Sequence, residues 1–252
     1  MKNSELMRRI TRNALAGTTH AALARRQASA DAKCAAGNLD VEREWRAARQ
    51  TKAVRTAHAS LREAVGPRER CMYCCDSHAT DIDHFWPKAN YPEKLFEWLN
   101  FLLCCTECGR FKGNRFPIEN GIPSLVDPTA EDPWQFLDFD VATGIIVARF
   151  DLATGAESKK GVETVRLLQL DRREALNQGY RKTWQRLAAT IAASLDQDGL
   201  DAKTLITTLK DVDDHGLLGW CFTGTGRGVA PFATLHARHP DVWTACAQSL
   251  VG

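Results

Sequence analysis

Residues 71–108 read CMYCCDSHATDIDHFWPKANYPEKLFEWLNFLLCCTEC, with two cysteines separated by two residues at each end. Cys71 and Cys74 form the first pair, and Cys105 and Cys108 form the second. Each C-x2-C pair can direct both thiolates at one ion, and four thiolates in a tetrahedron are a preferred ligand set of structural zinc. The stretch therefore predicts a zinc site that organises this part of the chain.

Neighbouring residues leave the choice of ligands open. Cys75 follows the first pair and Cys104 precedes the second. Using Cys104 would change the spacing to C-x3-C, so we prefer Cys105. His78 is an alternative ligand for zinc or magnesium. Three isolated cysteines are interpreted as structural: Cys34, Cys221 and Cys246.

The composition is that of a globular protein. The 252 residues are 44% hydrophobic and 25% charged, which is ordinary for this class. No apolar run approaches the roughly 18 residues that a membrane span needs, and the first residues lack the apolar core of a secretory signal. We therefore expect a cytoplasmic protein without membrane attachment, in which nine cysteines favour metal binding over disulfides.

Charge is distributed unevenly along the chain. Residues 1–70 hold 15 lysines and arginines against 7 acidic residues, whereas the remainder has a net charge of −6. A basic segment can attract a polyanion such as nucleic acid. A solvated helical face explains the same pattern, so charge alone identifies no partner.

The patterns predict an α+β protein that is mostly α-helical around a small zinc-bound module. Four regions are expected: a basic helical region over 1–66, the zinc-bound module over 67–117, a loop and β-hairpin over 118–160, and a helical region over 161–252. The first region should hold two helices separated near 34–40. The hairpin should lie within 136–150. Apolar residues at three- and four-residue steps predict an amphipathic helix: Leu176, Tyr180, Trp184, Leu187, Ile191 and Leu195. Asp171 and Glu174 resemble a capping box at its start.

The residues between the cysteine pairs can support phosphodiester hydrolysis. Zinc held by four thiolates has no open position, so chemistry there needs a second cation with oxygen ligands. His84 is the candidate base and Asp83 the candidate cation ligand. A buried structural histidine is the alternative for His84. Four basic residues could contact phosphates: Lys88, Arg110, Lys112 and Arg115.

Several short motifs make a family resemblance specific. The pattern CMYC…DIDHFWPK…WLNFLLCCTECGRFKGNRFP resembles HNH endonucleases of the zinc-bound ββα-metal type. Within that group, DHFWPK, W-x-NFLLC, KGNRFP and the later SLVDP are most similar to the HNH subunits of retron-linked and Septu-type antiphage systems. The resemblance covers about residues 71–117 and continues more weakly to about residue 187.

The resemblance implies roles for three residues and several partners. His84 would be the general base, Asp83 a ligand of a catalytic Mg²⁺ or Mn²⁺, and Asn100 the asparagine whose hydrogen bonds orient the loop that carries the histidine. The implied substrate is DNA, the implied setting is defence against phage, and the implied partner is an ATPase subunit. An RNA-directed nuclease is a further alternative.

One position departs from the family pattern. The residue after the second cysteine pair is usually Asn or His and binds the catalytic cation, but here it is Gly109. Asn114 lies about one and a half turns further along a regular helix and could replace it. Adjacent strand residues also point to opposite faces, so Asp83 and His84 can share a site only if the strand bends. A zinc-stabilised binding module without catalysis is therefore the alternative function.

Overall fold

The computed structural model describes residues 9–196 and 199–251. The chain divides into two compact units. The cysteine unit comprises residues 11–73 and 77–118, and the C-terminal unit comprises residues 9–10, 74–76 and the described residues after 118. No helix in the described ranges is long and apolar enough to span a membrane. Helices and short antiparallel strand pairs are both present, as expected for an α+β protein. The division of the chain into four regions at residues 66, 117 and 160 stays a prediction.

Three helices begin the cysteine unit, where the sequence predicted two. They are α1 (Gly17–Ala35), α2 (Val41–Arg49) and α3 (Lys52–Ala64). Residues 9–16 are not helical. Asp40 caps α2 by accepting a hydrogen bond from the Arg43 N–H, and the hydroxyl of Thr51 donates to the Ala48 carbonyl at 2.7 Å between α2 and α3.

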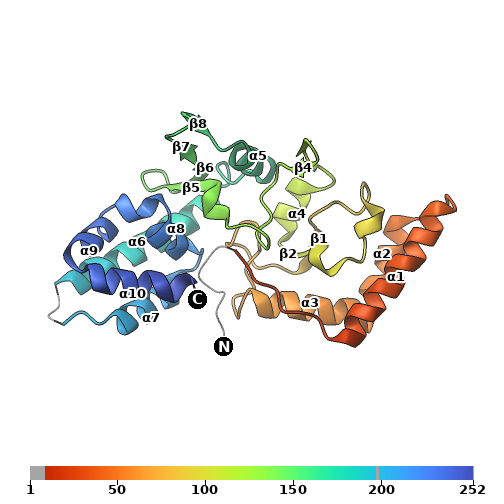
Figure 1. Cartoon of the computed structure of the whole chain (residues 1–252), viewed down its shortest axis with the longest axis horizontal. Helices are drawn as coiled ribbons and strands as arrows, with labels where there is room; N and C mark the ends of the chain where they lie inside the picture. The colour runs from red at the N-terminus through yellow and green to blue at the C-terminus, as the bar shows by residue number, and fades with distance from the viewer. Residues whose placement is uncertain (1–8, 197–198, 252) are drawn as a thin grey trace. The chain divides into compact units, whose positions relative to one another are not determined.

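A strand pair and a helix lie at the centre of the cysteine unit (Figure 1). The strand β1 (Asp81–His84) pairs antiparallel with β2 (Phe101–Cys104), so that His84 lies opposite Phe101. Two short 3-10 helices, η1 (Pro92–Lys94) and η2 (Trp98–Asn100), connect the strands. The helix α4 (Thr106–Lys112) follows directly. All four residues of β2 are buried, which fixes this strand in the core of the unit.

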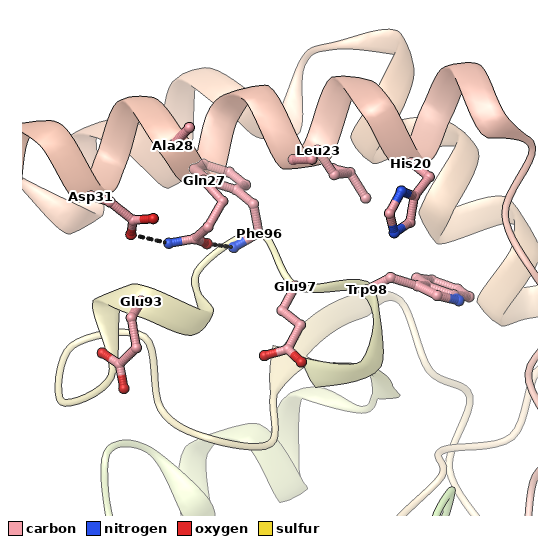
Figure 2. Close-up of a pocket in the computed structure, with 10 residues that line it drawn as sticks. His20, Leu23, Gln27, Ala28, Asp31, Glu93, Phe96, Glu97 and Trp98 are labelled. Carbon is pink, nitrogen blue, oxygen red and sulfur yellow. Dashed lines mark hydrogen bonds between the residues drawn. The ribbon is translucent and has the colours of Figure 1, made fainter.

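Helix α1 packs against the connection between the strands (Figure 2). Leu23 of α1 is buried, as are Phe96 and Trp98 of the connection. A cavity of about 400 Å³ remains beside them. Its lining includes three carboxylate side chains: Asp31, Glu93 and Glu97.

Short hairpins lead into the C-terminal unit. The strand β3 (Ile118–Glu119) pairs with β4 (Ile122–Pro123). The expected hairpin is confirmed, since β5 (Leu137–Asp140) pairs antiparallel with β6 (Ile145–Ala148). Its turn ends at Gly144, whose φ of +78° would strain any side chain. A smaller pair that the sequence did not predict follows, β7 (Phe150–Asp151) with β8 (Ala156–Glu157).

Helices make up the rest of this unit. The predicted amphipathic helix is α6, which runs over Glu174–Leu195 and buries five of its six predicted positions, while Leu195 is half-buried. The predicted capping box is wrong, because Arg173 occupies the N-cap and its side chain makes no capping bond. The core includes Tyr180, Trp220 and Phe232. The other helices are η3 (Pro133–Gln135), α5 (Lys159–Leu168), α7 (Ala202–Val212), α8 (Leu217–Thr223), η4 (Thr225–Gly228), α9 (Phe232–Arg238) and α10 (Pro240–Val251).

Candidate metal centre and candidate catalytic site

The four predicted cysteines form a compact buried cluster. The Sγ atoms of Cys71, Cys74, Cys105 and Cys108 all lie within 4.8 Å of one another. Zinc–sulfur bonds of about 2.3 Å in a tetrahedron place sulfurs about 3.8 Å apart, so the donor set and its spacing fit a structural zinc ion. The preference for Cys105 over Cys104 is confirmed.

Local hydrogen bonds explain why the cluster forms. Cys105 is the N-cap residue of α4, and its Sγ accepts the N–H of Cys108 at 3.4 Å. The first pair is attached to β2, because the Met72 N–H donates to the Leu103 carbonyl at 2.9 Å. Within the described residues, these four cysteines are the group of His, Cys, Asp or Glu side chains that lie close enough together to hold a metal ion. His78 instead contacts Glu69 at 3.0 Å.

His84 ends β1 in an enclosed aromatic environment. Its side chain is 4% exposed, and the indole ring of Trp45 in α2 meets the imidazole edge-on with centroids 4.5 Å apart. Phe101 makes a second edge-on contact at 5.2 Å. Burial lowers the pKa of His84 to about 4, so the imidazole is neutral near pH 7.

One hydrogen bond fixes the tautomer of this imidazole. The Nε2 atom of His84 lies 2.9 Å from the Leu95 carbonyl oxygen. A carbonyl oxygen only accepts, so the neutral ring carries its proton on Nε2 and donates it to Leu95. The lone pair is therefore on Nδ1, which is the nitrogen that can accept a proton.

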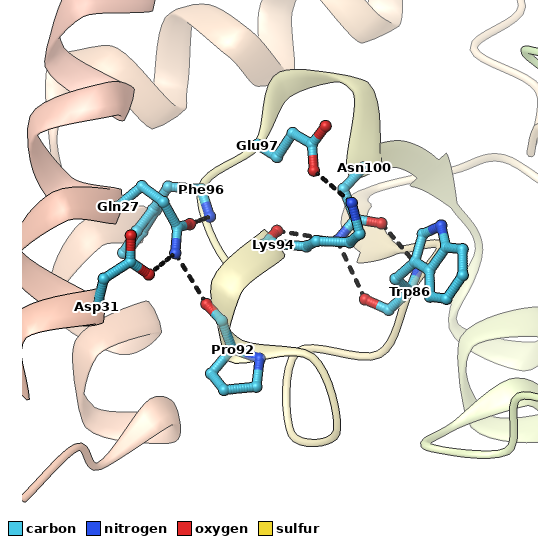
Figure 3. Close-up of polar contacts among 8 residues, drawn as sticks. All are labelled: Gln27, Asp31, Trp86, Pro92, Lys94, Phe96, Glu97 and Asn100. Atoms are coloured by element: carbon cyan, nitrogen blue, oxygen red, sulfur yellow. Dashed lines mark hydrogen bonds and ion pairs between the residues drawn. The ribbon is translucent and has the colours of Figure 1, made fainter. Parts of the chain in front are cut away.

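Asn100 holds both ends of the loop that follows His84 (Figure 3). Its side-chain oxygen accepts the Trp86 N–H at 2.7 Å. Its side-chain nitrogen donates to the Trp86 carbonyl at 3.0 Å and to the Lys94 carbonyl at 2.9 Å. Asn100 is buried and all of these bonds satisfy it. These bonds hold the loop between Trp86 and Lys94, and the catalytic importance of Asn100 stays a prediction.

Asp83 lies in a different environment from His84. Its Oδ2 atom accepts the Tyr73 hydroxyl at 2.8 Å and lies 3.0 Å from the Lys112 ammonium. Both contacts use Oδ2. The side chains of Asp83 and His84 thus contact different elements, α4 and α2, as strand alternation implies.

The expected phosphate contact by Lys112 is wrong. Its side chain is fully buried, and its Nζ donates to the His84 carbonyl at 2.6 Å besides pairing with Asp83. A buried ammonium needs such partners, because isolated burial of a charge is very costly. Lys112 therefore fixes the end of β1 and is not available to a nucleic acid.

The other expected basic residues differ in availability. Lys88 pairs with Glu42 of α2 and is mostly covered. Arg110 is exposed on α4 and lies over the Phe111 ring at 5.5 Å. Arg115 is exposed just beyond α4. Arg110 and Arg115 therefore remain candidates for phosphate contacts.

Gly109 and Asn114 are the two positions considered for a second ligand of the catalytic cation. Gly109 is in the middle of α4, and a Cβ placed there would meet the Cys104 Sγ at 3.6 Å, an ordinary contact distance. Asn114 is exposed beyond the end of α4 at Lys112, after Gly113 with a φ of +51°. The helical-turn argument for Asn114 as a cation ligand is therefore wrong.

Sequence reasoning missed the groups that hold the site residues. Trp45, which packs on His84, and Tyr73, which donates to Asp83, carry no sequence signal for these contacts. The role of Gln27 in α1 was also missed: its side chain accepts the Phe96 N–H at 2.7 Å and donates to the Pro92 carbonyl at 2.9 Å (Figure 3). A polar residue on a helix gives no sequence signal for such distant partners.

Comparisons with known proteins give one partial similarity. The chain is 26% identical over 112 residues to "Septu protein PtuB" from Bacillus thuringiensis. The match covers 42% of this chain and 38% of the length of that protein. No protein-family model matches the chain, and no solved structure matches it significantly.

Proposed function

We propose that this chain is a metal-dependent HNH endonuclease that hydrolyses phosphodiester bonds of DNA, and that it acts in a Septu-type antiphage system. The observation that carries the proposal is the state of His84. The imidazole is neutral, its Nε2–H is bound by the Leu95 carbonyl, and it ends a strand of a ββα arrangement beside four clustered cysteines. The partial similarity to a Septu protein supports the defence setting.

The residues of the chain would divide the work of hydrolysis. His84 Nδ1 would take a proton from the attacking water, and the Leu95 carbonyl would hold the ring in the tautomer that permits this. Asn100 would hold the loop in place, and Arg110 and Arg115 would bind the strand. Asp83 Oδ1 would be the ligand of the catalytic cation, because Oδ2 is already occupied.

A magnesium-type cation fits this donor set. Mg²⁺ and Mn²⁺ prefer oxygen ligands, and Mg²⁺ is often held by one or two carboxylates together with waters and substrate phosphates. When bound, such an ion stabilises the negative charge that develops on the phosphate and on the leaving oxygen.

A cleavage assay tests the proposal directly. The purified chain is incubated with plasmid and linear DNA at increasing manganese or magnesium concentration, beside His84→Ala and the matched exposed-histidine control His78→Ala. We expect His84→Ala to cut at least about 100-fold more slowly, since general bases contribute about that much, and His78→Ala to cut normally. Equal cutting by wild type and His84→Ala would show that His84 is not the base. An RNA substrate in parallel distinguishes the RNA-directed alternative.

A second candidate function is a zinc-stabilised binding module without catalysis. It is favoured by Asp83, whose Oδ2 is paired with the buried Lys112, and by the missing side chain at Gly109. The contacts of Asp83 and His84 with different elements also favour it, because a shared catalytic site needs both side chains on one side of β1. This alternative predicts nucleic-acid or protein binding without added divalent ion and no nicking at any manganese concentration. Gly109→Asn separates the two, because a gain of cleavage in that variant would identify the missing ligand as the cause.

The proposed partner is an ATPase subunit of the same system. This part of the proposal derives from the resemblance to Septu-type systems. It predicts that the neighbouring gene product copurifies with the chain and raises its cleavage rate in an ATP-dependent manner. Cleavage that is unchanged by that protein, together with separate elution of the two, would contradict the partner and leave the nuclease proposal intact.

A further inference from the structure

A small cleft lies between α2, α3 and β1 in the cysteine unit. Its volume is about 160 Å³. Arg49 of α2 and Arg55 and His58 of α3 supply its basic side chains, and Trp45 and Ile82 supply apolar walls. The cleft is thus built from elements of one unit, and its polar lining also includes Gln50, Thr80 and Asp81.

Arg55 and one ring nitrogen of His58 lack partners within the described part of the chain. Arg55 is exposed, and its guanidinium makes no ion pair or hydrogen bond there. The Nε2 atom of His58 is shielded from solvent and makes no hydrogen bond. A shielded polar atom without a partner is unfavourable, so a ligand that bonds to Nε2 would be stabilised at this position, and it would accept that bond when Nε2 carries the proton.

The charge of the cleft favours an anionic ligand. Its lining holds Arg49 and Arg55 against Asp81, a net charge of +1 when His58 is neutral. Asp81 lines the cleft but is compensated by Arg49, whose guanidinium lies 3.0 Å from its carboxylate. This pair is about half exposed, so it contributes little and can rearrange. The larger cavity beside α1 is lined by three carboxylates instead and would repel an anion.

The cleft adjoins the candidate catalytic residues. Asp81 and Ile82 line it, and they directly precede Asp83 and His84 on β1. Trp45 is shared, since it lines the cleft and also packs on the His84 ring. With a strand rise of about 3.3 Å per residue, Asp81 and Asp83 are roughly 7 Å apart along β1. This separation is short enough for the cleft and the candidate catalytic residues to contact one nucleic-acid strand.

We propose that this cleft binds a backbone phosphate of a nucleic-acid strand, a few nucleotides from the phosphate that is cut. The proposal rests on the proposed nuclease function and names a substrate-binding subsite for it. Arg55 provides the fixed charge and forked donors that suit a phosphate. His58 donates through Nε2 when its proton is on that atom. Arg49 adds a second guanidinium when it turns from Asp81 toward the phosphate.

A binding measurement tests this subsite without requiring cleavage. Fluorescence anisotropy of a labelled DNA oligonucleotide is measured on the full chain carrying His84→Ala, without added magnesium or manganese. Arg55→Ala, His58→Gln and the double variant are compared with Arg25→Ala, which removes an equal charge from an exposed position of α1 outside both cavities. Zinc content and circular dichroism verify that each variant is folded.

We expect the double variant to bind at least about tenfold more weakly than the parent. Its plot of log affinity against log salt should become shallower by about one phosphate contact. Arg25→Ala should change affinity less than about twofold. A double variant that binds as well as the Arg25→Ala control overturns the subsite, as does a parent chain that fails to bind DNA or RNA. Displacement of the oligonucleotide by low ATP concentrations would assign the cleft to a free nucleotide and would also overturn it.

The two proposals fail in distinguishable ways. If the wild-type chain does not cut DNA but the double variant loses binding, the nuclease proposal fails and the phosphate subsite holds. If the chain cuts DNA and the double variant binds and cuts normally, the subsite fails and the nuclease proposal holds.

Discussion

Individual residues of the candidate site are held by partners that lie far away in the sequence. His84 depends on Trp45 and Leu95, and Asp83 depends on Tyr73 and Lys112. Each contact has a physical consequence. Aromatic burial keeps the imidazole uncharged, and the ammonium of Lys112 balances a carboxylate that is mostly covered.

The neutral state of His84 predicts a dependence of stability on pH. The pKa of His84 is about 4 in the folded protein and about 6.5 in an unfolded chain. Acid therefore favours the unfolded state: the contribution of His84 to stability is complete above about pH 6.5 and is lost as the pH falls toward 4. We expect this group alone to cost about 2 kcal/mol between pH 7.5 and pH 5.

Comparison with His84→Gln isolates this effect. Urea unfolding is measured for both proteins at pH 7.5 and pH 5, and the loss on acidification is subtracted between them. Other groups, including the zinc thiolates, contribute equally to both proteins and cancel. Parallel losses in the two proteins would mean that His84 is not held neutral by burial.

The ion pair of Lys112 with Asp83 gives a second prediction at this scale. Lys112→Met leaves the carboxylate of Asp83 without its cation, and we expect a loss of about 3 kcal/mol in unfolding free energy. The double variant Lys112→Met with Asp83→Asn should recover much of this loss, because no uncompensated charge remains. A double variant no more stable than Lys112→Met would show that Lys112 contributes through packing alone. Lys203→Met, at an exposed position of α7, is the matched control.

Elements of the fold were predictable where the signal was local. The C-x2-C spacing predicted the four-cysteine cluster, and the period of apolar residues predicted α6. The separation of α2 from α3 at residues 50–51 was not predicted, since no proline or glycine marks it. The burial of Lys112 was not predictable, because its partner Asp83 lies 29 residues earlier in the sequence. The neighbouring residues of a lysine do not show whether its long side chain is buried or exposed.

Helix α1 acts on the site through the connection between the strands. Gln27 binds Phe96 and Pro92, and these residues flank Leu95, whose carbonyl holds His84. We predict that Gln27→Ala frees the Phe96 amide and raises its hydrogen-exchange rate by at least about fivefold, the loss expected for one hydrogen bond. Exchange is measured by NMR, with Arg25→Ala on the same helix as the control.

The same variant has a functional consequence under the nuclease proposal. Loosening of Leu95 would release the tautomer of His84 and lower kcat, while KM for DNA stays unchanged. Unchanged exchange in Gln27→Ala would contradict the role of Gln27 as a brace.

At the scale of the whole molecule, the chain has two compact units. Its described sheets have only two strands each, and a cluster of four cysteines lies beside one of them. The strands β1 and β2 have four residues each, and a two-stranded pair of this size is marginal by itself. The cysteine cluster joins positions as far apart as Cys71 and Cys108. A metal that binds the folded cluster therefore contributes directly to the free energy of folding.

Removal of the metal provides the last prediction. We expect one zinc per purified chain, measured by atomic emission. Cys108→Ser should lower or abolish that zinc content and expose the amides of β1 and β2 to exchange, because binding and folding of this region are coupled. Cys34→Ser, which changes an exposed cysteine outside the cluster, should retain zinc and protection. Full protection of β1 and β2 in zinc-free Cys108→Ser protein would show that packing of Phe101, Leu102 and Leu103 alone is enough to fold the strand pair.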